Sequence, residues 1–292
     1  MHLDLVYNPV AGSFREERLD RLEQAFRGQG MAVRPMPTTA GGAQLSGTAD
    51  LICVAGGDGT LRDTVLAMGE AAGKVPLSLA RLGTINLVAR ELKAPRQPTR
   101  LAEAIARSFA RGPDHWLKSP LYRLGELPIV SCLSIGPDAN AVASVSSPLK
   151  ARFGRYAYVV AMARQLKQWP RRELSIAGEL ADGAPFETIA EAAILSRGAL
   201  YAGPFRLSPQ AGLASNTVEL ITMRRSTRLA TLGLGTAVVA RLPIGRTGLV
   251  EIRSICRAHI DAGGAPVQVD GDHIADPAAE IGPSGIALRY CV

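Results

Sequence analysis

Residues 51–62 combine the residue types best suited to chemistry, because an apolar run passes directly into Gly56-Gly57-Asp58-Gly59-Thr60. Glycine permits positive φ and lacks the Cβ that would keep a ligand away from backbone N–H groups. Such N–H groups at the start of a helix, beside a hydroxyl and one carboxylate, suit a phosphate that carries a divalent cation. We expect Thr60 to cap a helix that continues to Met68. An ordinary strand-to-helix turn fits the pentapeptide equally well, so the surrounding elements must decide.

The N-terminal half predicts alternating strands and helices. Residues 51–55 are too short and too uniformly apolar for a surface helix, and they fit a buried parallel strand. Strands are also expected at 3–7, 31–36 and 78–80, and leucines and phenylalanine at helical spacing predict an amphipathic helix at 15–27. The turn at 81–86 should open a further helix, through Leu92. This pattern indicates an α/β domain over residues 1–120.

The C-terminal half, residues 121–292, changes character and predicts a β-rich domain. Short apolar runs bounded by Gly, Pro and Asn are typical of an antiparallel sandwich or barrel. The expected strands are at 129–135, 174–177, 192–195, 218–223, 250–260 and 267–270, and the expected helices are at 154–168 and 228–240. The apolar stretch in the second helix, 229–240, is too short to span a membrane, and we expect a core helix there.

Composition limits the class of protein and its partners. A formal charge of +7 and a pI near 9.5 favour anionic partners, which leaves phosphorylated ligands and anionic membranes open. We expect no nucleic acid, since no long Lys/Arg run, zinc-finger spacing or RNA-binding aromatic signature is present. The four cysteines are dispersed and predict reduced thiols. The first residues show no signal-peptide pattern, so we expect a cytoplasmic protein.

Three loops that follow strands carry the candidate ligand-binding residues. In an open α/β sheet, ligands bind beyond the carboxyl ends of the strands, where these loops meet. We therefore expect a site built from the following residues: Asn8, Gly12, Asp58, Thr60, Thr84 and Asn86. Neither the dinucleotide fingerprint GxGxxG nor the P-loop pattern GxxxxGK[ST] is present at these positions, so the site is of another kind.

The ordered motifs resemble the catalytic family of diacylglycerol kinases and sphingosine kinases, of which NAD kinases are distant relatives. The resemblance rests on Asn8-Pro9-Val10-Ala11-Gly12, Gly56 to Thr60 and Gly83-Thr84-Ile85-Asn86. It continues at Gly136-Pro137-Asp138-Ala139 and at Asp270-Gly271-Asp272. It implies a Rossmann-like N-terminal domain, a β-rich C-terminal domain and a nucleotide cleft between them, with the last residues packing back on the first domain.

The resemblance also implies cofactors and roles for single residues. ATP and Mg²⁺ are the expected cofactors, Asp58 is expected to act within the nucleotide–Mg²⁺ network, and Asp272 stands where the family places a glutamate as general base. The expected nucleotide-binding residues are Asn8, Pro9, Gly12, Thr39, Gly56, Gly57, Asp58, Gly59, Thr60, Gly83, Thr84, Asn86 and Gly271.

Some positions depart from the family pattern. Leu82 and Leu87 replace a proline and an aspartate, Asp272 is one methylene shorter than glutamate, and 213–219 lacks the Asp-Gly of a structural Mg²⁺ site. These departures fit a divergent substrate branch, and they also fit a non-catalytic relative.

The expected activity is transfer of the γ-phosphate of ATP to a hydroxyl of diacylglycerol, ceramide or a sphingoid base. An NAD kinase-like enzyme and a non-catalytic nucleotide- or lipid-binding relative are the alternatives. The basic and aromatic segment 149–172 suits transient contact with an anionic membrane surface at the inner membrane face, although packing on the sheet explains it as well. The substrate would be a membrane lipid, and a homodimer is left open.

Overall fold

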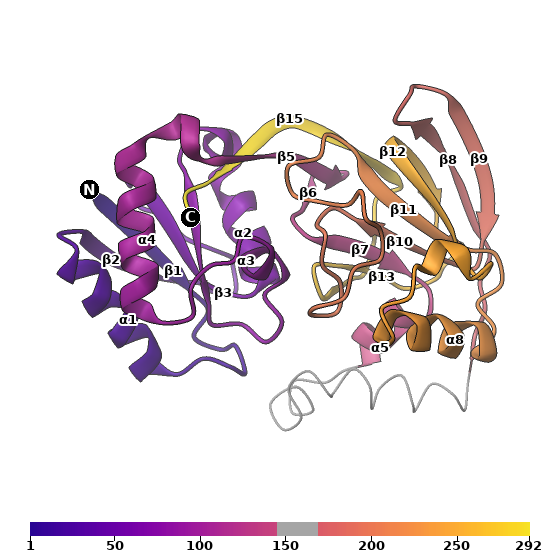
Figure 1. Cartoon of the computed structure of the whole chain (residues 1–292), viewed down its shortest axis with the longest axis horizontal. Helices are drawn as coiled ribbons and strands as arrows, with labels where there is room; N and C mark the ends of the chain where they lie inside the picture. The colour runs from indigo at the N-terminus through magenta and orange to yellow at the C-terminus, as the bar shows by residue number, and fades with distance from the viewer. Residues whose placement is uncertain (145–168) are drawn as a thin grey trace. The chain divides into compact units, whose positions relative to one another are not determined.

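The computed structural model describes residues 1–144 and 169–292. The chain forms two compact units, which consist of Met1–Leu121 with Gly285–Val292 and of Tyr122–Ser284 (Figure 1). The expected helix at 154–168 lies outside the described residues.

The first unit is an α/β domain with a parallel sheet, as the alternating pattern predicts. Its strands are β1 (His2–Tyr7), β2 (Ala32–Pro37), β3 (Leu51–Gly56) and β4 (Leu77–Arg81). They pair in the order β4-β3-β1-β2, and all these pairs are parallel. Its helices are α1 (Glu16–Gly28), α2 (Asp58–Met68), α3 (Leu87–Glu91) and α4 (Pro98–Arg111), with 3-10 turns at Gly69–Gly73 and Pro113–His115.

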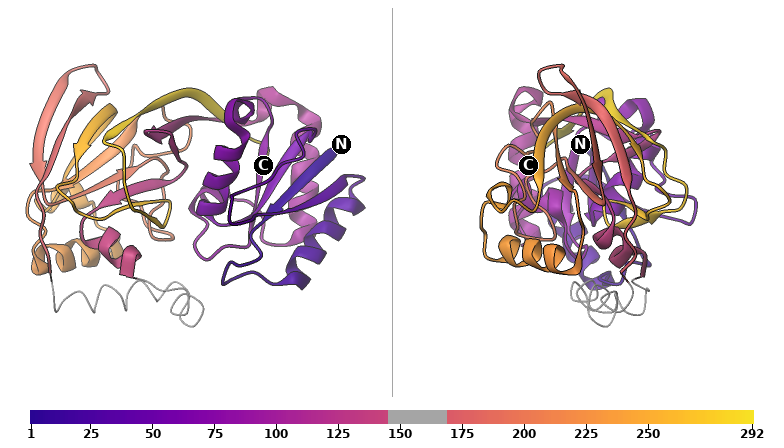
Figure 2. Two further views of the ribbon diagram at one scale, coloured as in Figure 1. Left: turned by 180° about the vertical axis from the view of Figure 1, so that it is seen from behind. Right: turned by 90° about the vertical axis from the view of Figure 1, so that its right-hand side faces the viewer.

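Two layers of helix cover this sheet. α1 and α4 pack against each other on one face, and α2 and α3 lie on the other, as both directions of view show (Figures 1 and 2). β3 carries apolar side chains that are buried on both faces, which is why it lacks a polar alternation. Leu5 lies opposite Cys53, and Cys53 opposite Ser78, so the loops after β1, β3 and β4 leave from one edge.

The start of α2 differs from the prediction. The helix begins at Asp58 with Gly57 as its N-cap, and no side chain caps it. Thr60 is therefore not a cap but a buried residue of the first turn, where its side chain occupies the space that a Cβ on Gly56 would need. Gly56 lets the strand turn sharply enough for the helix to begin three residues earlier than expected.

The second unit is β-rich and antiparallel. Its strands are β6 (Leu127–Ile129), β7 (Cys132–Ile135), β8 (Leu174–Leu180), β9 (Pro185–Ala190), β10 (Ala192–Ser196), β11 (Val218–Met223), β12 (Glu251–Asp261), β13 (Val267–Val269) and β14 (Asp272–Ile274). They pair in the order β14-β13-β7-β10-β11-β12, and the hairpin β8–β9 joins along β12. The helices are α5 (Pro137–Ser144) and α8 (Arg228–Val239), with a 3-10 turn at Ile244–Arg246.

Two strands pass from one unit to the other along the chain. β5 (Leu117–Leu124) contains the division after Leu121, and β15 (Glu280–Tyr290) contains the return at Gly285. Within the second unit Ile281 of β15 lies opposite Ala258 of β12, and within the first unit Tyr290 lies parallel to Leu77 of β4. The sequence pattern did not predict β15, because Gly282, Pro283 and Gly285 interrupt it like a loop.

Two expectations for the second unit are wrong. A continuous strand at 129–135 is interrupted between β6 and β7, because the N–H groups of Val130, Ser131 and Cys132 donate to the Asp270 carboxylate. The helix expected at 228–240 is present as α8, but it is not a core helix. Only Ala237 among its residues is buried, and Leu229 is 83% exposed.

Candidate nucleotide and acceptor sites

The Asp58 carboxylate joins two of the expected loops. Its Oδ2 accepts a hydrogen bond of 2.8 Å from the N–H of Leu87, and its Oδ1 accepts one of 3.0 Å from the N–H of Val88. These donors are the first backbone N–H groups of α3, so Asp58 satisfies the start of a helix from a position 29 residues away. Asp58 therefore holds the loop after β3 against the loop after β4.

Gly83 allows these two loops to approach closely. A Cβ at residue 83 would lie 2.4 Å from the Cα of Gly57 and 2.5 Å from the Oδ1 of Asn86. Since real Cβ contacts are not this short, any other residue at position 83 would push the loops apart. Gly56, Gly57, Asp58 and Asn86 line a small hollow at this junction.

Asn86 is the residue of this junction with an unused polar atom. Its backbone is left-handed, with φ of 56°, which asparagine tolerates better than most residues. The Nδ2 amide donates to the carbonyl of Gly83, at 2.7 Å. The Oδ1 is buried, and within the described part of the chain it has no hydrogen-bond partner. A buried acceptor of this kind fits a donor group on a bound ligand.

The first loop joins the same edge. The Asn8 side chain accepts a hydrogen bond from the N–H of Val10 and so fixes the turn that Asn8, Pro9 and Gly12 were expected to form. The hydroxyl of Ser13 donates to the carbonyl of Leu82 at 2.7 Å, which links this loop to the one after β4. Thr39 follows β2, where its hydroxyl accepts from Gly41 within its own turn. The loops of Asn8, Asp58 and Asn86 are thus brought together, and Thr39 serves a local turn.

The hairpin that carries Asp272 depends on its neighbour, Asp270. Asp270 and Gly271 both have positive φ, 53° and 90°, as a two-residue turn between β13 and β14 requires. The Asp270 carboxylate is buried and accepts from the N–H groups of Val130, Ser131 and Cys132 and from the hydroxyl of Ser131. Asp270 is therefore structural, whereas Asp272 at the start of β14 is only partly buried.

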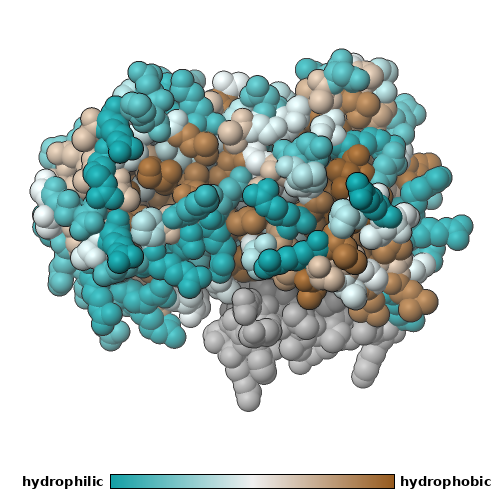
Figure 3. Space-filling view, viewed as in Figure 1, coloured by the Kyte–Doolittle hydropathy of each residue, from teal (hydrophilic) through white to brown (hydrophobic). Residues whose placement is uncertain are grey.

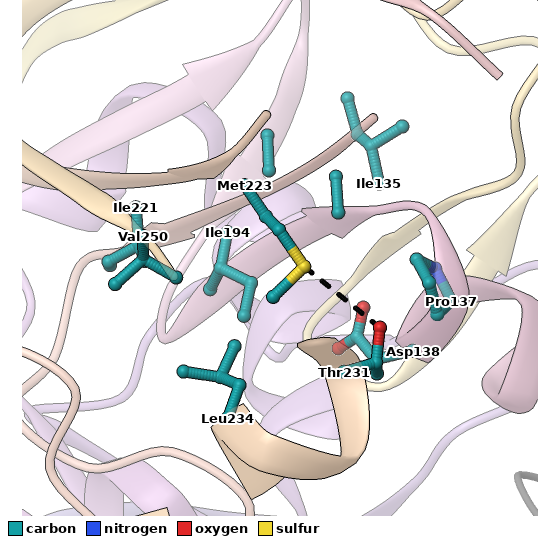
Figure 4. Close-up of a pocket in the computed structure, with 11 residues that line it drawn as sticks. Ile135, Pro137, Asp138, Ile194, Ile221, Met223, Thr231, Leu234 and Val250 are labelled. Carbon is teal, nitrogen blue, oxygen red and sulfur yellow. Dashed lines mark hydrogen bonds between the residues drawn. The ribbon is translucent and has the colours of Figure 1, made fainter. Parts of the chain in front are cut away.

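An apolar cavity of about 70 Å³ lies in the second unit (Figure 4). Its walls come from β7, β10 and β11 and from α8, and Asp138 supplies its charged group. The lining residues are Ile135, Pro137, Asp138, Ala192, Ala193, Ile194, Ile221, Met223, Thr231, Leu234 and Val250. A cavity of this size has room for more than one water molecule, and apolar walls favour hydrocarbon over water.

Asp138 is a candidate site residue that the sequence analysis missed. It belongs to one of the motifs that carry the family resemblance, but no role was assigned to it there. It stands in the first turn of α5 and accepts a hydrogen bond from the hydroxyl of Tyr201. Burial raises the pKa of the Asp138 carboxyl, and the hydrogen bonds from Ser134, Tyr201 and the N–H of Ala139 oppose this rise. Burial, followed by the charge of Asp138, raises the pKa of Tyr201. The motif Gly136-Pro137-Asp138-Ala139 was the only sequence signal that pointed to Asp138. The apolar residues around its side chain come from strands that are distant in the sequence, so no local pattern reveals them.

The residues present determine how a metal ion would fit. Among the described residues, no group of three or more His, Cys, Asp and Glu side chains is arranged to hold one. In the segment that lacks the family's Asp-Gly, the buried guanidinium of Arg197 donates to the carbonyls of Gly212 and Leu213, at 2.9 and 2.6 Å. The charged guanidinium of Arg197 thus holds this loop. At the candidate nucleotide site of the first unit, Mg²⁺ would have to be held mainly by the nucleotide phosphates.

The comparisons with known proteins agree on one family. Residues 2–115 match the model of the diacylglycerol kinase catalytic domain. A diacylglycerol kinase of Bacillus subtilis (strain 168) is 24% identical over 79% of this chain and 78% of the relative. One from Staphylococcus aureus (strain JH9) is 26% identical over 78% and 72%.

Solved structures show the same fold at lower identity. A diacylglycerol kinase structure from Bacillus anthracis str. Sterne covers 98% of this chain, and 94% of that chain is matched, with a TM-score of 0.71 and 16% identity. The two units thus share the fold of that structure. Over residues 2–115 the chain thus matches the model of the diacylglycerol kinase catalytic domain, and it is similar to diacylglycerol kinases over 79% of its length.

Proposed function

We propose that this protein is an ATP-dependent lipid kinase, a phosphotransferase that acts on an alcohol group. The observation that carries the proposal is the apolar cavity with Asp138 in its lining. Lipids present a hydroxyl beside a hydrocarbon chain, and this cavity combines a hydrogen-bonding carboxyl with apolar walls. An NAD acceptor, which is polar and carries phosphates, does not match those walls. The names of the curated relatives support the same class of acceptor.

The first unit suits the phosphate groups of ATP. No side chain caps the N-terminus of α2, so the N–H groups of its first turn and the positive end of the helix dipole favour a phosphate. Gly56 and Gly83 let the loops pack closely around this helix start, because Thr60 and Gly57 occupy the space that a Cβ at those positions would need. Mg²⁺ bound with ATP would neutralise phosphate charge, as phosphoryl transfer requires. Asp58 keeps these loops in register through its hydrogen bonds to Leu87 and Val88.

The transfer step needs a base near the acceptor hydroxyl. The hydroxyl oxygen forms a bond to the γ-phosphorus, the bond from that phosphorus to the bridging oxygen breaks, and ADP leaves. We assign the hydroxyl proton to Asp272, whose strand β14 lies against α5, the helix of Asp138. Asp138 would position the head group from the cavity.

A labelled-ATP assay over diacylglycerol, ceramide and sphingosine in mixed micelles tests the activity, with NAD as a control acceptor. We expect phosphate transfer to at least one lipid. Transfer to NAD alone would reject the lipid assignment, and ATP binding without any transfer would favour the non-catalytic alternative.

The base is tested by Asp272→Asn against Asp270→Asn. General base catalysis contributes about 100- to 10,000-fold, so Asp272→Asn should lose turnover by that order, while the protein still folds and ATP affinity stays near that of the wild type. Asp270→Asn should instead lower the unfolding midpoint, because the wild-type carboxylate accepts hydrogen bonds from the N–H groups between β6 and β7. Normal turnover by Asp272→Asn would show that another group takes the proton.

A further inference from the structure

α8 is apolar on both of its sides although it lies at the surface. On the inner side Ala237 is buried, and Leu234 and Val238 pack against a small core that includes Ile221 and Ile244. On the outer side Leu229, Leu232 and Val239 are 83%, 48% and 67% exposed. A helix that is apolar all round is normally covered all round, so the outer side of α8 calls for a covering surface.

A basic rim flanks α8 in the sequence, with arginines before and after the helix. Residues 224–250 contain no Asp or Glu, and Arg224, Arg225, Arg241 and Arg246 are exposed within this range. In the part of the chain that the structure describes, none of these four arginines is in an ion pair. Leu242, directly after Arg241, is 54% exposed and extends the apolar surface beyond the helix. Apolar side chains reach the surface at the lower right of Figure 3, where Figure 1 draws α8.

We propose that α8 with residues 224–246 is the surface by which this protein docks on an anionic lipid bilayer. Exposed leucines can enter the boundary between head groups and acyl chains, while arginines beside them contact lipid phosphates. The charge of the rim favours this occupant, since a second copy of the chain would bring the same arginines together. Trp169 adjoins the surface, because its indole N–H donates to the carbonyl of Ser226, just before the N-cap Thr227.

This surface also bears on the acceptor site. Thr231 and Leu234 of α8 line the apolar cavity from within, as Figure 4 shows. The helix that rests on the bilayer is therefore also a wall of the cavity, so a lipid would have a short path between them. This link rests on the proposed kinase function, whereas docking on a bilayer does not.

Vesicle co-sedimentation without ATP tests the docking. The purified full chain is mixed with phosphatidylcholine vesicles or with vesicles that also contain phosphatidylglycerol. We expect binding to the anionic vesicles that weakens with salt. Leu229→Ser with Leu232→Ser should lower the partition coefficient by about tenfold or more per leucine, from the lost apolar burial. Arg224→Gln with Arg225→Gln should lower it by about fivefold per arginine on anionic vesicles only.

Leu66→Ser provides the matched control, because Leu66 is also a helical leucine, 52% exposed, but belongs to α2 of the first unit. It should bind vesicles like the wild type. The proposal is refuted if the wild type does not bind anionic vesicles or if the leucine pair binds as well as the control. It is also refuted if sedimentation shows a wild-type dimer that the leucine pair dissociates while vesicle binding is unchanged.

Kinase turnover separates this proposal from the proposed function. With a short-chain diacylglycerol dissolved in water, the leucine pair should turn over like the wild type, and on vesicles it should lose activity with binding. Vesicle binding without turnover on any lipid would leave the docking surface intact and reject the kinase function.

Discussion

The main expected effect of replacing Asp58 by asparagine is a looser loop after β4, and not a change in metal binding. In the wild type both carboxylate oxygens accept backbone N–H groups, from Leu87 at 2.8 Å and from Val88 at 3.0 Å. Asparagine keeps one oxygen and places an NH₂ group against the second N–H. One hydrogen bond to a charged acceptor is lost, which costs about 1.5–3 kcal/mol, and the other becomes a neutral bond.

The partial exposure of Asp58 places the expected loss near the lower end, at about 2 kcal/mol. A local loss of that size corresponds to roughly 30-fold more frequent opening, since about 1.4 kcal/mol is tenfold. Hydrogen exchange of the peptide that contains residues 83–91 measures this opening directly. We expect exchange there to accelerate by that order and exchange in α1 and α4 to remain unchanged.

Calorimetry of ATP binding then separates two roles of the carboxylate. If Asp58 positions the loops, the variant loses ATP affinity to the same extent with and without Mg²⁺. Asp63→Asn is the matched control, because Asp63 lies in the same helix and pairs only with the adjacent Arg62 among the described residues. Unchanged exchange together with a loss confined to Mg²⁺-containing buffer would refute the positioning role and assign Asp58 to the metal.

Three further predictions concern the stability of the protein. Burial raises the pKa of Asp138, so the folded state holds a proton that the unfolded chain releases near pH 4, and stability should fall as pH rises from there through the raised pKa. Asp138→Asn should therefore gain stability over the wild type with rising pH in urea unfolding, and parallel pH profiles would contradict this. Arg197→Met should lower the free energy of unfolding by about 2–5 kcal/mol, from the lost bonds to the carbonyls of Gly212 and Leu213. EDTA should leave the wild-type midpoint unchanged, and a lower midpoint with EDTA would show that a metal also holds the structure.

The sequence by itself determined the elements of the first unit and the place of its loops. An apolar run such as 51–55 has few alternatives to a buried parallel strand, and glycine-rich turns after successive strands must leave from one edge of the sheet. The helix at 15–27 followed from the spacing of its apolar residues and is present as α1.

Only the tertiary structure decided what individual side chains do. Whether Asp58 contacts a metal or the N–H groups of Leu87 and Val88 depends on a contact across 29 residues, which no local pattern contains. The break between β6 and β7 has the same origin, because the acceptor, Asp270, lies about 140 residues away. α8 was expected to be a core helix, because composition shows only how apolar a segment is. Which side of it the neighbouring strands cover is fixed by the packing of the whole domain.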